Sequence, residues 1–261
     1  SKQKLIWAHN YKVPFRSNLK IIDNKVVVSD QNNSILIVDK KNGEKLRIFP
    51  TEEMTLKNEF INSFALNENK LFYLNTFGTI YALDRQSLKI NWFLNMNQSL
   101  DMNLNNLFYS NSVAANNKNI FISTNPFLYI LDSTSGATIF KESINLISKP
   151  IITKNGLFLI TADNLLIYKD LKKQKIVYSI DIVGEIASFL NTKKKSIFIK
   201  SFSIVNNELF IFLENSYLVR FRSNGKINKI VKLPAKLGTT PIFINNSILY
   251  LSKKNKLIIL N

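Results

Sequence analysis

The sequence predicts an all-β fold, a β-propeller of about six four-stranded antiparallel blades. Short apolar runs of strand length alternate with turns rich in Asn, Asp, Gly and Lys, which is the pattern of strands joined by hairpins. The same order of small residue, three apolar runs and a closing Asp or Asn recurs six times, at the irregular spacing of four-stranded blades. A β-helix would repeat at shorter intervals, and a β-sandwich would not repeat one strand pattern six times.

The third repeat illustrates the pattern most clearly. It begins with an inner strand at Ser112, continues through two apolar strands over 120–123 and 127–132, and ends with an outer strand over 137–140. The turn after Asp132 contains Gly136, a residue that readily adopts the positive φ of a tight hairpin. Four such strands make one blade.

The other repeats align on this one and place the blades in a single domain over 1–261. The predicted blade cores lie near 17–49, 60–94, 110–142, 148–180, 197–231 and 238–261. Inner strands crowd around the propeller axis and therefore begin with small residues, namely Ser17, Ser63, Ser112, Ser148 and Thr240. Middle strands are covered on both faces by neighbouring blades, so they are nearly continuous apolar runs. Positive φ is expected at Gly43, Gly136 and Gly225.

The two ends of the sequence complement each other. The last repeat ends after its third strand, at Asn261, whereas residues 4–10 resemble the outer strand around Trp92. We therefore expect the N-terminal strand to complete the last blade, which would close the ring and leave no open strand edge there.

One segment departs from the strand pattern. Over 181–195, apolar residues recur at helical spacing and are followed by three lysines, which predicts a short amphipathic helix inserted between two blades. Its apolar face packs either on its own blade or on a partner. The candidate interaction residues are Ile186, Phe189, Leu190, Lys193, Lys194 and Lys195.

The net charge of +17 raises the question of an anionic partner. Only five of the 35 Lys and Arg residues are arginine, the side chain that base and phosphate recognition favours. A solvated, lysine-rich surface is therefore favoured over a dedicated polyanion site, and no nucleic-acid partner is expected.

The sequence contains no convincing catalytic, metal or cofactor site. Cysteine is absent and His9 is the only histidine, which excludes thiolate chemistry and multi-histidine metal sites. Asp39, Asp84 and Asp132 occupy equivalent positions in their blades, so they are predicted to cap turns. The pair Glu52-Glu53 follows Pro50 and is predicted to lie in a solvated loop. We expect no enzyme activity.

No apolar run is long enough to span a bilayer, and the start Ser1-Lys2-Gln3-Lys4 carries no signal peptide. We therefore expect either a cytosolic protein or one whose targeting segment precedes Ser1.

The segment from Leu131 to Phe140, LDSTSGATIF, resembles the repeat of the quinoprotein, or PQQ-like, propellers, written as apolar-Asp-x-x-Thr-Gly-x-x-x-Trp. Residues 81–92 and 38–43 are weaker copies, and Leu5-Ile6-Trp7 and Ser148-Lys149-Pro150 match further parts of it. The resemblance extends over essentially the whole chain.

Two branches of this superfamily differ in function. The quinoprotein dehydrogenases carry eight blades, a vicinal Cys pair and a calcium site, from which this chain departs in having no Cys and fewer blades. The other branch, which this chain resembles more, is the BamB family of propeller lipoproteins of the outer-membrane β-barrel assembly machinery, usually also eight-bladed.

The resemblance to the BamB family implies a non-catalytic, monomeric periplasmic scaffold without a cofactor. It would be held at the outer membrane by a lipid on a segment upstream of Ser1, and would bind the barrel-forming subunit. Two alternatives stay open: a PQQ-, quinone- or sugar-binding enzyme that uses the central funnel, and a cytosolic interaction propeller that binds acidic partners.

Overall fold

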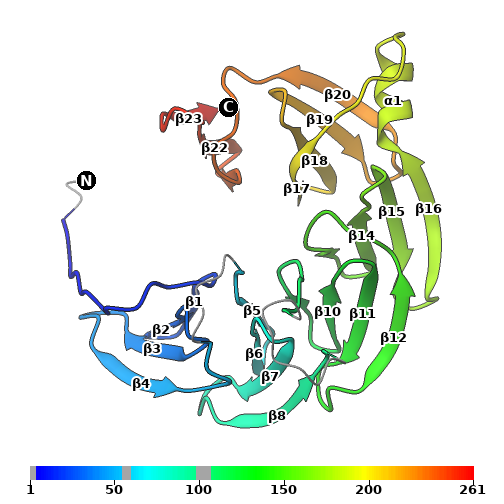
Figure 1. Ribbon diagram of the computed structural model, residues 1–261. Coiled ribbons are helices and arrows are strands. Elements are labelled where there is room, and N and C mark those ends of the chain that lie inside the picture. The colour runs from blue at the N-terminus through cyan, green and yellow to red at the C-terminus, as the bar shows by residue number, and fades with distance from the viewer. Residues whose placement is uncertain (1–3, 55–59, 98–106) are drawn as a thin grey trace. The chain divides into compact units, whose positions relative to one another are not determined.

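The computed structural model describes residues 4–54, 60–97 and 107–261. In these ranges the strands form six antiparallel sheets, within each of which consecutive strands pair (Figure 1). The predicted fold class is confirmed: the chain is all-β, and its sheets are the blades of a β-propeller. The chain divides into two compact units, Ser1–Lys149 and Pro150–Asn261, with three of the sheets in each. The single domain over 1–261 stays a prediction.

The first unit contains three four-stranded blades. Their strands are β1 Lys20–Ile22, β2 Lys25–Ser29, β3 Ile35–Asp39 and β4 Lys45–Phe49; β5 Ser63–Leu66, β6 Lys70–Leu74, β7 Thr79–Asp84 and β8 Ile90–Asn95; and β9 Ala114–Ala115, β10 Asn119–Ser123, β11 Phe127–Asp132 and β12 Thr138–Ser143.

The second unit contains two four-stranded blades, one three-stranded blade and a helix. Its elements are β13 Ile151–Ile152, β14 Gly156–Ile160, β15 Leu165–Asp170 and β16 Lys175–Asp181; α1 Ile182–Phe189; β17 Ile199–Val205, β18 Glu208–Leu213, β19 Tyr217–Arg222 and β20 Ile227–Lys232; and β21 Ile242–Ile244, β22 Ser247–Leu251 and β23 Leu257–Leu260.

The middle strands of the first five blades are mostly buried, as their continuous apolar runs predict, whereas β22 and β23 of the last blade are only partly covered. All five residues of β14 are buried, and in β6 every residue after Lys70 is buried. The outer strands β8 and β12 alternate between exposed and half-buried residues because one of their faces meets solvent. Five blades also share a register shift between the third and fourth strands, next to the closing Asp or Arg. The repeats of the sequence are therefore equivalent in backbone geometry.

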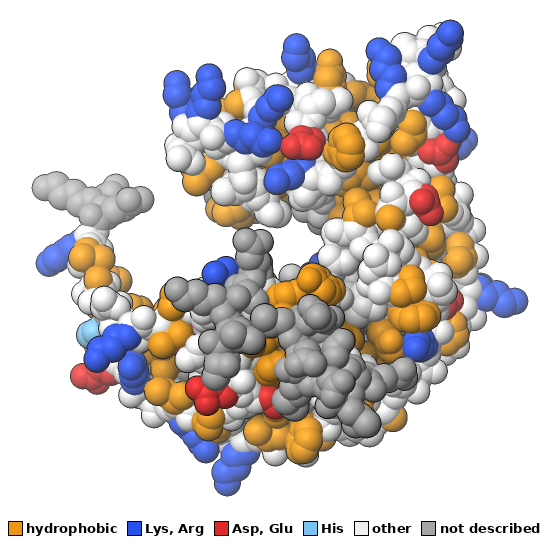
Figure 2. All heavy atoms as spheres, viewed as in Figure 1, with side chains coloured by type: hydrophobic (Ala, Val, Ile, Leu, Met, Phe, Trp, Pro, Cys, Tyr) orange, Lys and Arg blue, Asp and Glu red, His pale blue; other side chains and the backbone are white. Residues whose placement is uncertain are grey.

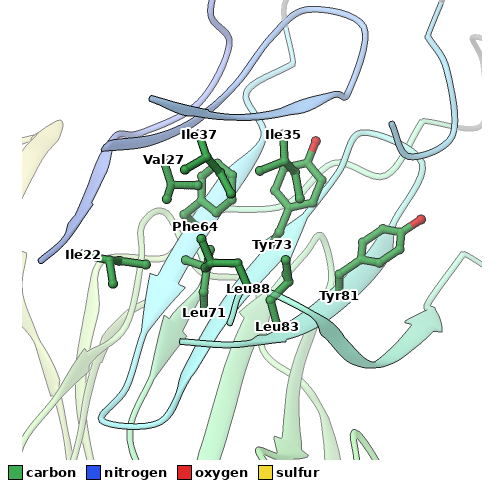
Figure 3. Packing of buried hydrophobic residues seen from close by; sticks show 10 residues of the cluster. All are labelled: Ile22, Val27, Ile35, Ile37, Phe64, Leu71, Tyr73, Tyr81, Leu83 and Leu88. Atoms are coloured by element: carbon green, nitrogen blue, oxygen red, sulfur yellow. The ribbon is translucent and has the colours of Figure 1, made fainter. Parts of the chain in front are cut away.

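The cores lie between successive blades. Figure 3 shows how Val27, Ile35 and Ile37 of the first blade pack against Phe64 and Tyr73 of the second. Similar clusters join the second and third blades in the first unit, and each pair of successive blades in the second unit. Because these clusters join neighbouring sheets, the stability of a blade depends on the blade packed against it. The last sheet, β21–β23, leaves Ile242, Leu257 and Ile259 exposed.

Two of the turn glycines, Gly43 and Gly136, are each covered by an aromatic ring from an earlier part of the chain. Gly43 and Gly136 have φ values of 73° and 76°, as predicted, so each occupies a backbone conformation that side chains disfavour. A Cβ on Gly136 would lie 2.8 Å from the ring of Trp92 in the preceding blade, and one on Gly43 would lie 2.5 Å from the ring of Trp7. The glycines therefore serve both the turn and the close packing of the ring.

The small residues of the inner strands join neighbouring blades. Ser63 of β5 is buried, and its hydroxyl oxygen accepts a 2.8 Å hydrogen bond from the backbone N–H of Val113 in the next blade. Asn18 likewise donates to the carbonyl of Phe64 at 2.8 Å and accepts from its N–H at 2.7 Å. A larger side chain at Ser63 would separate the two backbones.

Residues 4–10, predicted as the fourth strand of the last blade, form no strand in the structure. They contact the first blade instead: the indole N–H of Trp7 donates to the carbonyl of Lys40 at 2.9 Å, and the His9 ring lies 2.8 Å from the carbonyl of Asn42. The sheet β21–β23 has three strands among the described residues. Closure of the ring by residues 4–10 stays a prediction.

Candidate functional site

The helix α1 begins where the outer strand β16 ends, within the range in which the sequence predicts an insertion. Asp181 caps it: one carboxylate oxygen accepts a 3.0 Å hydrogen bond from the N–H of Gly184, and Glu185 places a further negative charge in the first turn. At the other end, the N–H of Leu190 donates to the carbonyl of Ile186 at 3.1 Å. Local capping therefore positions α1 against β16 and β20, which it contacts.

The structure separates the predicted apolar interaction residues into two groups. Ile186 packs against the core cluster that α1 shares with the fourth and fifth blades, together with the fully buried Ile182. Phe189 and Leu190 instead remain 50% and 48% exposed. Phe198, which the sequence did not single out, is 70% exposed in the segment after the lysines. Phe189, Leu190 and Phe198 are the exposed large apolar side chains of this segment.

The three lysines also differ. All three are exposed to solvent, but the ammonium of Lys194 forms a 2.6 Å ion pair with Asp181. Figure 2 shows Lys and Arg side chains gathered around α1. We call Phe189, Leu190, Phe198 and Lys193–Lys195 the α1 surface. It combines apolar side chains with positive charge, which suits an apolar partner segment that carries carboxylates.

Replacing Asp181 with Ala is expected to weaken α1 by about 1 kcal/mol, because the N-cap acceptor and the partner of Lys194 are both removed. The Lys194 ammonium and the N–H of Gly184 hold the pKa of Asp181 below its ordinary value. A depressed carboxyl pKa stabilises the fold above the unfolded value of about 3.9, and that contribution is lost as the pH falls through the lower folded value.

Amide hydrogen exchange of α1 measures this effect, with the exposed turn residue Asp163 replaced by Ala as the control. We expect lower protection factors in α1 for Asp181→Ala, and in the unaltered protein below about pH 4, once rates are corrected for the intrinsic pH dependence of exchange. Equal exchange in the two variants would contradict the capping role.

The repeated aspartates cap turns, as predicted. One carboxylate oxygen of Asp132 accepts from the backbone N–H of Thr134 and Ser135, at 2.9 and 2.7 Å. Asp84 accepts from the N–H and the hydroxyl of Ser87, and Asp39 from the N–H of Lys41. The hydrogen bonds from Ser87 and Ser135 hold the pKa of Asp84 and of Asp132 below the ordinary range. These carboxylates stabilise hairpins.

The prediction of a solvated loop at Glu52-Glu53 is wrong for Glu52. Its carboxylate accepts three hydrogen bonds of 2.6 Å, from the Asn75 amide and the hydroxyls of Thr79 and Tyr81. Burial, and then the hydrogen bond to Glu52, raise the pKa of Tyr81 above its ordinary value. The sequence signal was weak, because Asn75, Thr79 and Tyr81 lie in the second blade and only the fold brings them to Glu52. Glu53 is exposed, as predicted.

In the described ranges, no group of three or more His, Cys, Asp or Glu side chains is placed to hold a metal ion. None of the helices in the described part of the chain is both long and apolar enough to cross a membrane.

No protein-family model matches the chain, and no curated protein matches it. Among solved structures, it superposes on the crystal structure of BamB from Moraxella catarrhalis with a TM-score of 0.62 and 12% sequence identity, over 97% of this chain and 85% of that one. In fold, the chain is similar to BamB. At this identity the likeness to BamB describes the path of the backbone, and it transfers no binding residue.

Proposed function

We propose that this protein is a non-catalytic scaffold propeller of the BamB type. In this proposal it acts in the periplasm, at the outer membrane, and assists the assembly of outer-membrane β-barrel proteins by binding the barrel-forming subunit as a monomer. The fold likeness to BamB over 97% of the chain carries the proposal. The PQQ-like repeat pattern around Asp132 and Gly136 supports it, because that repeat is typical of the same group of propellers.

The α1 surface is the element that we propose for partner binding. Phe189 and Leu190 lie half exposed beside one another, where a partner would bury apolar area that the blade leaves open. The exposed Lys193 and Lys195 follow them in the chain and would orient an acidic segment of the partner. Ile186 contributes indirectly, since its packing in the core holds the helix in place.

The experiment measures binding of the purified protein to the soluble periplasmic part of the barrel-forming subunit by biolayer interferometry. Replacing Phe189 with Ser and Lys195 with Glu is expected to weaken binding at least about 30-fold, the loss of an interface hot spot. The matched control carries Val177→Ser and Lys254→Glu, an exposed apolar residue and an exposed lysine of the same unit. Its affinity should equal that of the unaltered protein.

The possible outcomes distinguish the two parts of the proposal. No binding at concentrations up to tens of micromolar would contradict the BamB-type function. Binding that the Phe189 and Lys195 replacements leave unchanged would contradict the role of the α1 surface only. The quinoprotein alternative instead requires heat of binding when the protein is titrated with PQQ and calcium, for which a scaffold should give none.

The net charge of +17 favours a second candidate, a cytosolic interaction propeller for acidic ligands. Affinity for such a ligand would fall steeply with salt, because most of the binding free energy would come from ion pairing. Binding through the α1 surface would fall less steeply with salt, because Phe189 and Leu190 contribute apolar contact in addition to the ion pairs of the lysines. Repeating the binding measurement over a range of salt concentrations therefore separates the two candidates.

A further inference from the structure

The first unit contains a cavity of about 650 Å³ at one end of its second and third blades, within the size range of small-molecule sites. It lies beside the turn between β6 and β7 and the turn between β10 and β11. Its walls include Phe60, Thr76, Tyr109, Asn111 and Asn125. The α1 surface belongs to the other unit, and it shares no residue with this cavity.

Of the described residues that line this cavity, none is charged, although one residue in five of the whole chain is charged. The lining consists of aromatic and aliphatic side chains together with asparagines, serines and threonines. Because a buried or half-buried charge on a ligand needs an opposite charge or several strong hydrogen bonds, this lining suits an uncharged molecule.

An aromatic platform forms one wall. Tyr109 is 67% exposed, and its ring meets the ring of Phe60 edge to face, with 4.2 Å between the centroids. This contact restrains the tyrosine while one of its faces remains free. The face of an aromatic ring carries negative charge density, which attracts the weakly positive C–H groups of a saturated ring.

Hydrogen-bonding groups are left available around this platform. The side chains of Ser110, Asn125 and Asn145 make no hydrogen bond to any other described residue, and each lines the cavity. Together they offer amide N–H donors, carbonyl acceptors and a hydroxyl that can do both. Adjacent hydroxyl groups of a ligand would satisfy such a set.

The wall carrying Tyr109 is held in place from both sides. The ring of Phe108 lies over Gly78, where an added Cβ would come within 2.7 Å of that ring. The backbone N–H of Phe108 donates a 2.9 Å hydrogen bond to the carbonyl of Thr76. The amide of Asn111 donates to the carbonyl of Leu146 at 2.9 Å and to the hydroxyl of Ser123 at 3.1 Å. A site whose walls are fixed before binding loses less conformational entropy when the ligand enters.

From this geometry we infer that the cavity binds a neutral carbohydrate, with one sugar ring lying on Tyr109 and its hydroxyls bonded to Ser110, Asn125 and Asn145. An uncharged peptide could also form hydrogen bonds here. It would gain less binding free energy than a sugar ring does from the exposed face of Tyr109. The inference does not rest on the scaffold function proposed above.

Saturation-transfer difference NMR of the whole protein tests this, with triacetylchitotriose and maltotriose as probes at about 5 mM, well above the millimolar affinities of weak sites. We expect saturation of the ring protons of at least one sugar. Tyr109→Ala should reduce the signal at least about fivefold and Tyr109→Phe should retain it, because the ring face is kept. Raising the salt concentration should change the affinity less than about twofold, since no charges meet.

Phe93→Ala is the matched control, because Phe93 is exposed to the same degree as Tyr109 but lies on the outer strand β8. It should leave the signal unchanged, and both alanine variants should keep the melting temperature of the unaltered protein. The inference is overturned if neither sugar receives saturation, or if Tyr109→Ala leaves the signal intact. It is also overturned if only a neutral capped tripeptide of Gly and Asn gives a Tyr109-dependent signal.

Discussion

Replacing Glu52 with Ala is expected to lower the free energy of unfolding by about 3 kcal/mol, whereas the same replacement at its neighbour Glu53 should change it by less than about 0.5 kcal/mol. The difference arises because only the Glu52 carboxylate accepts hydrogen bonds from the second blade. Its removal leaves the amide of Asn75 and the hydroxyls of Thr79 and Tyr81 without this acceptor.

The size of the Glu52 effect follows from the kind of bond. A hydrogen bond to a charged group contributes about 1.5 to 3 kcal/mol, but Glu52 is only half-buried, so water replaces part of the loss. The loop is also held from its other side: Thr51 donates to the carbonyl of Asn33 at 2.7 Å, and Met54 is buried with Phe77. This second anchor should keep the loop folded in the variant.

Thermal unfolding measures this prediction, with Glu53→Ala as the matched control. For a chain of this size, 3 kcal/mol corresponds to a decrease of about 6 to 12 °C in the melting temperature. Glu52→Gln should lie between the unaltered protein and Glu52→Ala, since it keeps one carbonyl acceptor and loses the charge. Equal melting temperatures for the two alanine variants would support the solvated loop that the sequence suggested.

Deleting residues 1–10 is expected to lower the melting temperature by about 10 °C. The deletion removes Trp7, whose ring covers Gly43; because Trp7 is half-buried, its loss costs about 2 to 3 kcal/mol, less than the loss of a fully buried aromatic. The hydrogen bond from the Trp7 indole to Lys40 is lost with it. Trp7→Ala in the full chain should reproduce most of the decrease.

The packing of Trp7 repeats a relation seen elsewhere in the fold. Trp92, on the outer strand of the second blade, covers Gly136 in the third, and Ile180, on the outer strand of the fourth, lies against Gly225 in the fifth. In each case an outer strand covers the turn glycine of the following blade. Trp7 covers the turn glycine of the first blade, so it occupies the place of a residue from the outer strand of a preceding blade. This supports the predicted closure of the ring by residues 4–10.

Ile6→Asp separates closure from simple packing on the first blade. Ile6 is strongly exposed in the structure, so packing of Trp7 alone predicts a change of less than about 0.5 kcal/mol. If residues 4–10 complete the last blade, the side chain of Ile6 becomes covered, and Ile6→Asp lowers the free energy of unfolding by more than this. A deletion of residues 1–10 that leaves the melting temperature unchanged would contradict both the closure and the packing of Trp7.

Features with a local cause were predictable from the sequence. Gly43 and Gly136 stand where hairpins need positive φ, and Asp84 and Asp132 accept from backbone N–H groups two or three residues ahead. The helix α1 follows from the apolar spacing within 181–195. Each depends on residues close in the sequence; the glycines and aspartates recur from blade to blade, and the helix stands out because it interrupts that recurrence.

The candidate site was predictable only in part. Helical spacing placed Ile186 and Phe189 on one apolar face, but spacing cannot tell which of them meets the core, and the structure buries part of Ile186 while leaving Phe189 exposed. Phe198 lies beyond the helical pattern, so no periodicity marked it. The described residues that line the cavity beside Tyr109 come from five separate segments, none of which carries a recognisable motif.

By itself, the sequence determined the blade: strand lengths, hairpin turns, turn-capping aspartates and the burial of middle strands all follow from short-range patterns of polarity and backbone preference. Only the tertiary structure decided what Glu52, Trp7 and Tyr109 contact, because their partners lie in other strands or blades. Contacts between distant segments depend on how twisted sheets pack face to face. A repeating strand pattern specifies that the sheets pack, but not which polar side chains meet where they do.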